Sequence, residues 1–227
     1  MDELRLVVLD VNETLSDLDP LRQRFADLGL DPGLSATWFA SVLRDGFALT
    51  ALEQMHGFAD LGSDALRDLA PGIGDDDVES VLDTFTSLSL HPDVVPGLRR
   101  LAEAGIEVVT LSNGSTGVAE GLLQRAGVRD LVADVLSVDD VGVWKPHPRA
   151  YAHALAGRDA DAGQTALVAV HPWDLHGASS AGLRTAWIRR GERHWPGAFT
   201  APDVTADGLD AAAERLMDGG AGPDSRA

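Results

Sequence analysis

Short apolar runs alternate with amphipathic stretches along most of this chain. Five runs rich in β-branched residues predict strands over residues 5–9, 106–111, within 131–137, 166–170 and 185–188. Stretches with helical spacing lie between them, over residues 96–104, 117–126, 149–155 and 175–181. Because parallel strands need crossover connections, this alternation predicts an α/β fold with a Rossmann-like parallel sheet flanked by helices.

The stretch from residue 16 to residue 92 breaks this rhythm. It has no strand pattern, and its apolar residues follow helical spacing, as in Trp38, Val42 and Leu43. We therefore expect an inserted α-helical cap over 16–92, and an α/β catalytic core made of residues 1–15 and 93–218. The insertion begins just past the first strand, where it would cover that strand's end. Residues 219–227 have the composition of a disordered tail.

Polar residues follow four of the predicted strands. They are Asp10 and Thr14, then Ser112 and Asn113, then Lys145, and finally His171, Trp173 and Asp174. Parallel strands end at one edge of a sheet, where ligands bind, so these residues should form one site. Asp10 is the candidate nucleophile, because a carboxylate at the tip of a buried strand is costly unless it is used or paired. Taken alone, Asp10 fits a turn or a helix cap equally well.

Composition narrows the function classes. A net charge of -18 argues against nucleic acid or an anionic membrane as partner. The absence of cysteine excludes disulfides and a thiol nucleophile, and no run of about 18 apolar residues predicts a membrane span. With no secretion signal pattern, we expect a cytoplasmic enzyme. Lysine is scarce, which makes Lys145 conspicuous, since an anionic substrate would need local positive charge.

The motifs together resemble the haloacid dehalogenase superfamily. They are DVNETL at 10–15, LSNGS at 111–115, WKPHPRAY at 144–151 and VAVHPWDLHGA at 168–178. With WIRR at 187–190, they are most similar to the L-2-haloacid dehalogenase branch. The resemblance covers nearly the whole core. It implies hydrolysis of a small 2-haloalkanoic acid to a 2-hydroxy acid of inverted configuration plus halide, without metal or other cofactor, and it allows a homodimer.

The resemblance also implies a role for each site residue. Asp10 attacks the carbon that bears the halogen and forms an aspartyl ester, which water then hydrolyses. Lys145 keeps Asp10 ionised, Thr14 hydrogen-bonds it, and Asp174 orients Lys145 or water. Ser112 binds the substrate carboxylate, helped by backbone N–H groups of the following helix, and Asn113 donates to the departing halide. The resemblance also gives Tyr151 a place in the substrate-binding wall. We further expect Asn12, Phe39 and Trp173 in that wall, although aromatic residues at helical spacing such as Phe39 fit a plain core equally.

Two departures from that branch concern the chemistry and the cap. The branch usually has an asparagine near the position of His171, and we expect His171 to activate water together with Glu13, because imidazole titrates near pH ~6.5. The alternative is that His171 only hydrogen-bonds a loop carbonyl while Glu13 is solvated. In the cap, Phe39 stands where the branch has an arginine after tryptophan. Arg44, further along the same predicted helix, either reaches the substrate or lies at the surface.

Two other functions compete with dehalogenation. The first is a Mg²⁺-dependent phosphatase of small metabolites, which would use Asp10 as nucleophile and Asp174 as a metal ligand. Such enzymes usually have a second aspartate at the position of Asn12, and an amide cannot shuttle a proton. The second is a non-catalytic binding protein. The presence together of Asp10, Ser112, Lys145 and Asp174 argues against it.

Overall fold

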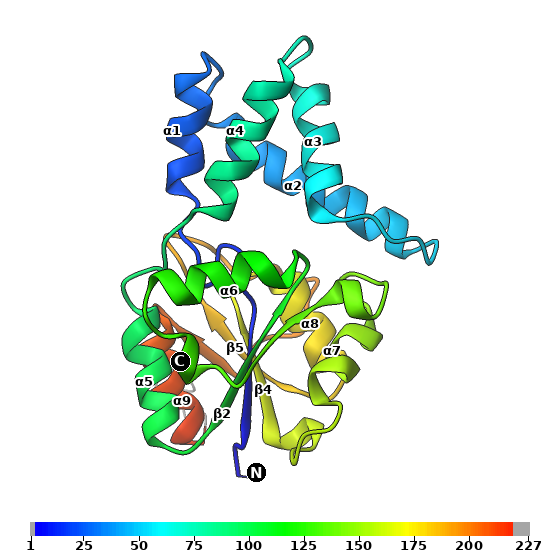
Figure 1. Ribbon diagram of the computed structural model, residues 1–227. Helices are drawn as coiled ribbons and strands as arrows, with labels where there is room; N and C mark the ends of the chain where they lie inside the picture. The colour runs from blue at the N-terminus through cyan, green and yellow to red at the C-terminus, as the bar shows by residue number, and fades with distance from the viewer. Residues whose placement is uncertain (1–2, 220–227) are drawn as a thin grey trace.

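Six parallel strands form the centre of this computed structural model, which describes residues 3–219 (Figure 1). The strands are β1 (Leu6–Leu9), β2 (Glu107–Ser112), β3 (Asp134–Ser137), β4 (Thr165–Ala169), β5 (Arg184–Ile188) and β6 (Val204–Ala206). Their spatial order is β3-β2-β1-β4-β5-β6. Strand β1 pairs with β2 on one side and β4 on the other, so Leu6 lies in register with both Glu107 and Thr165. The end of β1 is therefore central.

Helices cover both faces of the sheet. On one face lie α5 (Val94–Glu103), α6 (Thr116–Arg125) and α9 (Leu209–Met217); on the other lie α7 (Pro148–Leu155) and α8 (Pro172–Ser180). Short 3₁₀ helices η1 (Arg129–Leu131), η2 (Val138–Asp140) and η3 (Ala162–Gln164) occupy connections. Successive β1 residues face opposite layers, Leu6 and Val8 toward α7 and α8, Val7 and Leu9 toward the other three. This is why β1 is apolar throughout rather than alternating.

Four further helices stand over the carboxyl ends of the strands (Figure 1). They are α1 (Asp19–Asp27), α2 (Leu34–Thr50), α3 (Phe58–Leu69) and α4 (Asp75–Thr86). Trp38 is fully buried at their centre, with edge-on contacts to Phe58 and Phe85. Its indole N–H donates to the carbonyl of Gly62 at 2.8 Å. The helical layer thus has its own apolar centre, as the spacing around Trp38 predicts.

All five predicted strands are present in the sheet. The four predicted core helices also occur, although α5 begins at Val94 and α8 at Pro172, each earlier than expected. Strand β6 and helix α9 were not predicted. The limits proposed for the core and the cap stay predictions, and the proposed tail lies, from residue 220 on, outside the described residues.

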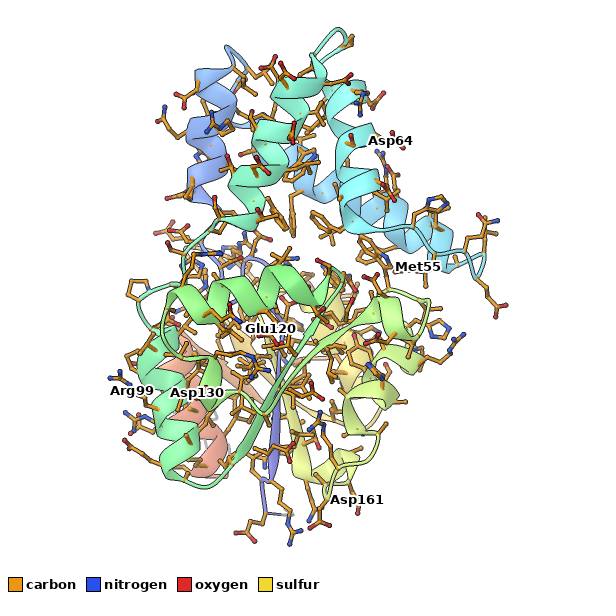
Figure 2. All side chains as sticks on the ribbon, viewed as in Figure 1. Met55, Asp64, Arg99, Glu120, Asp130 and Asp161 are labelled. Atoms are coloured by element: carbon orange, nitrogen blue, oxygen red, sulfur yellow. The ribbon has the colours of Figure 1, made fainter. Side chains whose placement is uncertain are left out.

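Acidic side chains lie on the outside of both layers, among them Asp64, Asp130 and Asp161 (Figure 2). Within residues 3–219, no helix combines the length and the apolar character needed to cross a bilayer.

The helical layer is fitted to the core through Gly46 of α2. A methyl group at Gly46 would overlap the ring of Trp144, which is buried next to Lys145. The indole of Trp144 also stacks on Phe58 of α3 and donates to the carbonyl of His56. This close approach fixes how α2 sits above the connecting segment that contains Trp144 and Lys145.

Gly46→Ala tests this fit. We expect the overlap with Trp144 to lower the free energy of unfolding by about 1–3 kcal/mol in urea titrations. Gly117→Ala in α6 is the control, because nothing lies near the added methyl group and alanine suits a helix better. Equal stability of the native protein and Gly46→Ala would show that the two layers are not closely packed there.

Candidate active site

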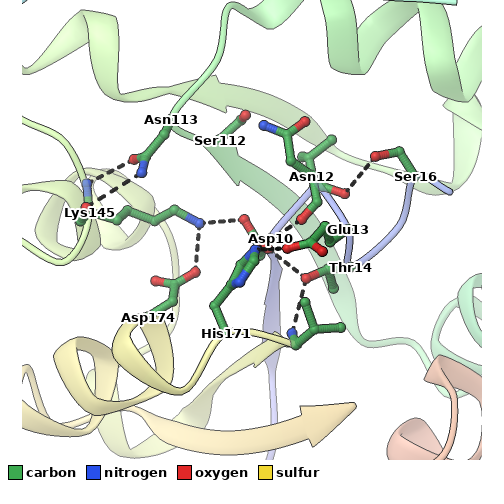
Figure 3. A network of polar contacts seen from close by, with 12 residues as sticks. Asp10, Asn12, Glu13, Thr14, Ser16, Ser112, Asn113, Lys145, His171 and Asp174 are labelled. Atoms are coloured by element: carbon green, nitrogen blue, oxygen red, sulfur yellow. Dashed lines mark hydrogen bonds and ion pairs between the residues drawn. The ribbon is translucent and has the colours of Figure 1, made fainter. Parts of the chain in front are cut away.

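The predicted site residues meet at the carboxyl edge of the sheet (Figure 3). Asp10 directly follows β1, Ser112 ends β2, and His171 precedes helix α8, which carries Asp174 in its first turn. Lys145 arrives from the connection after β3. Because β1 lies between β2 and β4, groups from both sides converge on Asp10.

A buried ammonium group joins two buried carboxylates at the centre of the site. Lys145 Nζ donates to Asp10 Oδ1 at 2.8 Å and to Asp174 Oδ2 at 2.7 Å. The other oxygen of Asp10 accepts from Thr14 Oγ1 at 2.5 Å, and that of Asp174 accepts from the Tyr151 hydroxyl at 2.7 Å. All four carboxylate oxygens therefore accept a hydrogen bond, which offsets the loss of solvation.

The pKa directions separate the two carboxylates. Burial is the largest single influence and would raise the pKa of Asp10, but the charges of Lys145 and His171, together with the hydrogen bonds from Lys145 and Thr14, hold the pKa below its usual value. Burial raises the pKa of Asp174. The positive charge of Lys145 lowers this pKa, while the negative charge of Asp10 raises it further, and the net shift is upward. Burial also opposes the charge on Lys145, yet Asp10 and Asp174 raise its pKa. Of the two carboxylates, Asp10 therefore loses its proton more readily, as suits a nucleophile.

The backbone of Lys145 is fixed by two neighbours. Asn113 accepts from the Lys145 N–H at 2.9 Å and donates to its carbonyl at 3.4 Å. Thr50, at the end of α2, accepts from the N–H of Trp144 at 3.0 Å. The side-chain amide of Asn113 therefore positions Lys145. The second N–H bond of that amide remains for a ligand.

Ser112 and Asn12 border the space beside Asp10 (Figure 3). Ser112 Oγ accepts from the N–H of Gly114 at 2.9 Å, just before helix α6 begins. Both side chains are buried. The hydroxyl of Ser112 keeps its hydrogen for an acceptor, and the first N–H groups of α6, which lack partners within the helix, lie a few residues further along the chain. This is a place where an anionic group can be held.

His171 lies where both interpretations of it predicted contacts. Its Nε2 is 3.2 Å from the carbonyl of Asn12, 3.6 Å from Glu13 Oε2 and 3.7 Å from Asp10 Oδ2. All three neighbours are acceptors, so Nε2 carries a hydrogen and the lone pair of a neutral ring lies on Nδ1. The imidazole stacks between Trp173 and Phe39, with centroids 5.0 and 6.2 Å away.

Two of the predicted substrate-binding residues do not face the site. Arg44 is exposed and bonds Asp45 through Nε at 2.7 Å and Nη2 at 2.9 Å, because its chain neighbour is the nearer carboxylate. The prediction that it grips substrate is therefore corrected. Tyr151 is fully buried behind Asp174, to which its hydroxyl donates, so it supports a site residue rather than lining the pocket.

A cavity of about 460 Å³ opens beside His171. Glu13, Phe39 and His171 line it together with Arg190 and Arg193. Asp10 is not on its wall but lies behind His171. The cavity gives small molecules a space next to the Glu13–His171 pair.

Two arginines at this site were given no role by the sequence analysis, although Arg190 ends the WIRR motif at 187–190. Arg190 donates to the carbonyls of Glu13 and Thr14, and Arg193 lies 3.4 Å from Glu13 Oε1. The position of Arg190 just past β5, at the same sheet edge, was the available signal. Nothing in the local pattern marks Arg193. In the part of the chain that the structure describes, no three or more His, Asp or Glu side chains gather as a metal site would require.

Comparisons with known proteins agree on one family. Residues 4–182 match the family model described as haloacid dehalogenase-like hydrolase. The chain is 30% identical to (S)-2-haloacid dehalogenase 1 of Pseudomonas sp. (strain CBS-3), over 84% of this chain and 86% of that protein. It is similar in structure to the L-2-haloacid dehalogenase RSc1362 (TM-score 0.87, 28% identity, 96% of this chain, 100% of that one). It is also similar to a dehalogenase with intermediate complex (TM-score 0.84, 27% identity, 92% and 95%).

Lys145→Met tests the central ion pair. Removing the ammonium leaves two buried carboxylates without a counter-charge, so we expect the free energy of unfolding at pH 7 to fall by about 3–5 kcal/mol. The difference from the native protein should narrow as the pH is lowered, because protonation removes the uncompensated charge. Urea titrations at several pH values measure this.

Arg5→Met is the control, since it breaks an exposed pair with Asp159 and should change stability little. A Lys145→Met protein as stable as the native one at pH 7 would contradict the expectation.

Proposed function

The chain belongs to the haloacid dehalogenase-like hydrolases, among which it is similar to the (S)-2-haloacid dehalogenases, and we propose that it hydrolyses small 2-haloalkanoic acids to 2-hydroxy acids of inverted configuration. The observation that carries this proposal is the state of Asp10. It is buried at the end of a strand, hydrogen-bonded by Lys145 and Thr14, and held ionised by the neighbouring ammonium. A desolvated, oriented carboxylate is suited to attack carbon.

In the first half-reaction, an oxygen of Asp10 attacks the carbon that carries the halogen from the side opposite the leaving group. The new C–O bond forms as the carbon–halogen bond breaks, and the halide leaves with the bonding electrons. Ser112 and the first N–H groups of α6 hold the substrate carboxylate, and the remaining N–H of Asn113 is offered to the halide. The product is an ester between Asp10 and the substrate carbon.

In the second half-reaction, water attacks the carbonyl carbon of this ester. His171 Nδ1 accepts a proton from the water, while Glu13 stabilises the imidazolium from the Nε2 side. The bond between the Asp10 carbonyl carbon and the ester oxygen then breaks, and the departing oxygen takes the proton from His171. Asp10 returns to its carboxylate by releasing the second water proton to solvent. What supports this assignment is the 3.6 Å separation of His171 from Glu13.

The helical layer of α1–α4 acts in this proposal as a cap. It supplies Phe39 to the wall against His171, and Phe47 of α2 makes an edge contact with Trp173 at 4.8 Å. These apolar rings keep bulk water away from the reacting carbon. They also favour a short substrate. The small acid and the halide are the only partners that the proposal needs. The proposal also assigns the enzyme to the cytoplasm.

The phosphatase alternative is not favoured by the residues present. A divalent cation would need free oxygens of Asp10 and Asp174. Each of those oxygens already accepts a hydrogen bond, and Lys145 Nζ occupies the position between them. The side-chain amide of Asn12 also cannot act as the general acid that protonates a leaving alcohol. The donor set does not fit a metal, so no step is assigned to one.

The proposal predicts halide release from L-2-chloropropionate in the presence of EDTA. Asp10→Asn should reduce the rate at least ~10³-fold, because the amide cannot form the ester. Asp76→Asn on the exposed first turn of α4 is the control and should keep full activity. Phosphate release from p-nitrophenyl phosphate that requires Mg²⁺, with no halide from any haloacid, would overturn the proposal.

His171→Asn separates the two half-reactions. We expect one equivalent of halide followed by accumulation of an ester on Asp10, with steady-state turnover lowered about 10²–10⁴-fold by loss of the base. Mass spectrometry of the peptide that contains Asp10 detects the adduct. Full turnover by this variant would show that His171 is not the base.

A further inference from the structure

Arg190 lies two residues past β5, and four of the five N–H bonds of its guanidinium are donated within the protein. Nε donates to the carbonyl of Glu13 at 3.2 Å, and Nη2 donates to that of Thr14 at 2.6 Å. Nη1 and Nη2 also bond the two carboxylate oxygens of Asp93, at 3.0 and 3.2 Å. A planar fork that is satisfied in this way holds its partners in fixed positions.

Glu13 has a backbone conformation that needs such support. Its φ angle is 61°, in the left-handed region that residues other than glycine rarely adopt. In this conformation its side chain lies beside His171, with Oε2 3.6 Å from Nε2 (Figure 3). The carbonyls of Glu13 and Thr14, which belong to consecutive peptide bonds, both accept from the guanidinium of Arg190. The clamp therefore acts on the turn that aims the Glu13 carboxylate.

Asp93 anchors the clamp to the core. It lies immediately before α5 and also accepts from the N–H of Leu209, the first residue of α9, at 2.7 Å. Burial would raise the pKa of Asp93, but the hydrogen bonds from Arg190 and Leu209 hold it below the usual value. The ionised Asp93 is held between α5 and α9, and it therefore keeps the guanidinium of Arg190 in a fixed position.

Thr14 touches the same guanidinium but has independent support. Its Oγ1 accepts from the N–H of Val170 at 3.1 Å while donating to Asp10. Apart from His171, the Glu13 carboxylate has one charged partner among the described residues, the half-exposed Arg193. Loss of Arg190 should therefore disturb Glu13 much more than the hydroxyl that orients Asp10.

We propose that Arg190, anchored by Asp93, is a positioning residue for ester hydrolysis, because it holds the Glu13 turn so that the carboxylate faces His171. The inference rests on the proposed dehalogenase function and assigns Arg190 no contact with substrate. It predicts that Arg190 matters for the second half-reaction and little for the first.

Single-turnover experiments with L-2-chloropropionate, quenched at successive times, measure halide release and the ester on Asp10 separately. In Arg190→Met we expect halide release within about twofold of the native rate, and ester decay slowed about tenfold or more, since misaligning a base forfeits part of its contribution. Arg189→Met is the matched control. It removes the adjacent arginine, whose pair with Asp207 is exposed, and should leave both rates unchanged.

A double-mutant cycle with Glu13→Gln distinguishes positioning from general loosening. If Arg190 acts through Glu13, Arg190→Met should add little to the slow ester decay of Glu13→Gln. Asp93→Asn keeps the shape of the anchor and should slow ester decay in the same selective way. It supplies the test if Arg190→Met does not fold, as judged by thermal melting.

Equal slowing of both half-reactions, or additive effects of Arg190→Met and Glu13→Gln, would overturn the inference and leave the proposed function standing. Unchanged ester decay in Arg190→Met and Asp93→Asn would do the same. If the native protein releases no halide and forms no ester, the proposed function fails, and the role of Arg190 fails with it.

Discussion

The hydrogen-bonded ammonium between Asp10 and Asp174 is the constraint on which the rest of the site depends. Three charged groups without water are tolerable only if each is compensated, so their positions must be held within a few tenths of an ångström. The sheet order achieves this by placing β1 between β2 and β4. The end of β1 can then receive Lys145 and Asn113 from one side and His171 and Asp174 from the other. Packing of α2 on Trp144 closes the arrangement from above.

Much of this could be predicted from the chain because the main signals are local. A buried strand followed by a polar residue marks the sheet edge, and this located Asp10, Ser112 and His171. What was missed or given the wrong role depends on individual contacts, distant along the chain for β6 and Tyr151 and adjacent for Arg44. Strand β6 has three residues and is defined by pairing with β5. Tyr151 reaches Asp174 only because α7 packs on α8, and Arg44 turns outward because Asp45 adjoins it.

Asp10 and the Glu13–His171 pair are held in place in two different ways. Asp10 is prepared by charge, through the ammonium of Lys145, so the nucleophile stays ionised without the help of solvent. The Glu13–His171 pair is prepared by backbone geometry and ring stacking, through a left-handed turn and two aromatic neighbours. In the proposed reaction, charge therefore decides whether the first step can start, and shape decides where the base of the second step lies.

Lys145 is the single lysine of the chain, and it is completely buried. Among side chains, amine-reactive reagents therefore have one target, and they can reach it only when the helices over the sheet move away. The rate at which Lys145 is acylated would report directly on opening of the molecule. For the same reason, immobilisation through surface lysines is not available to this protein, whereas its many exposed carboxylates are.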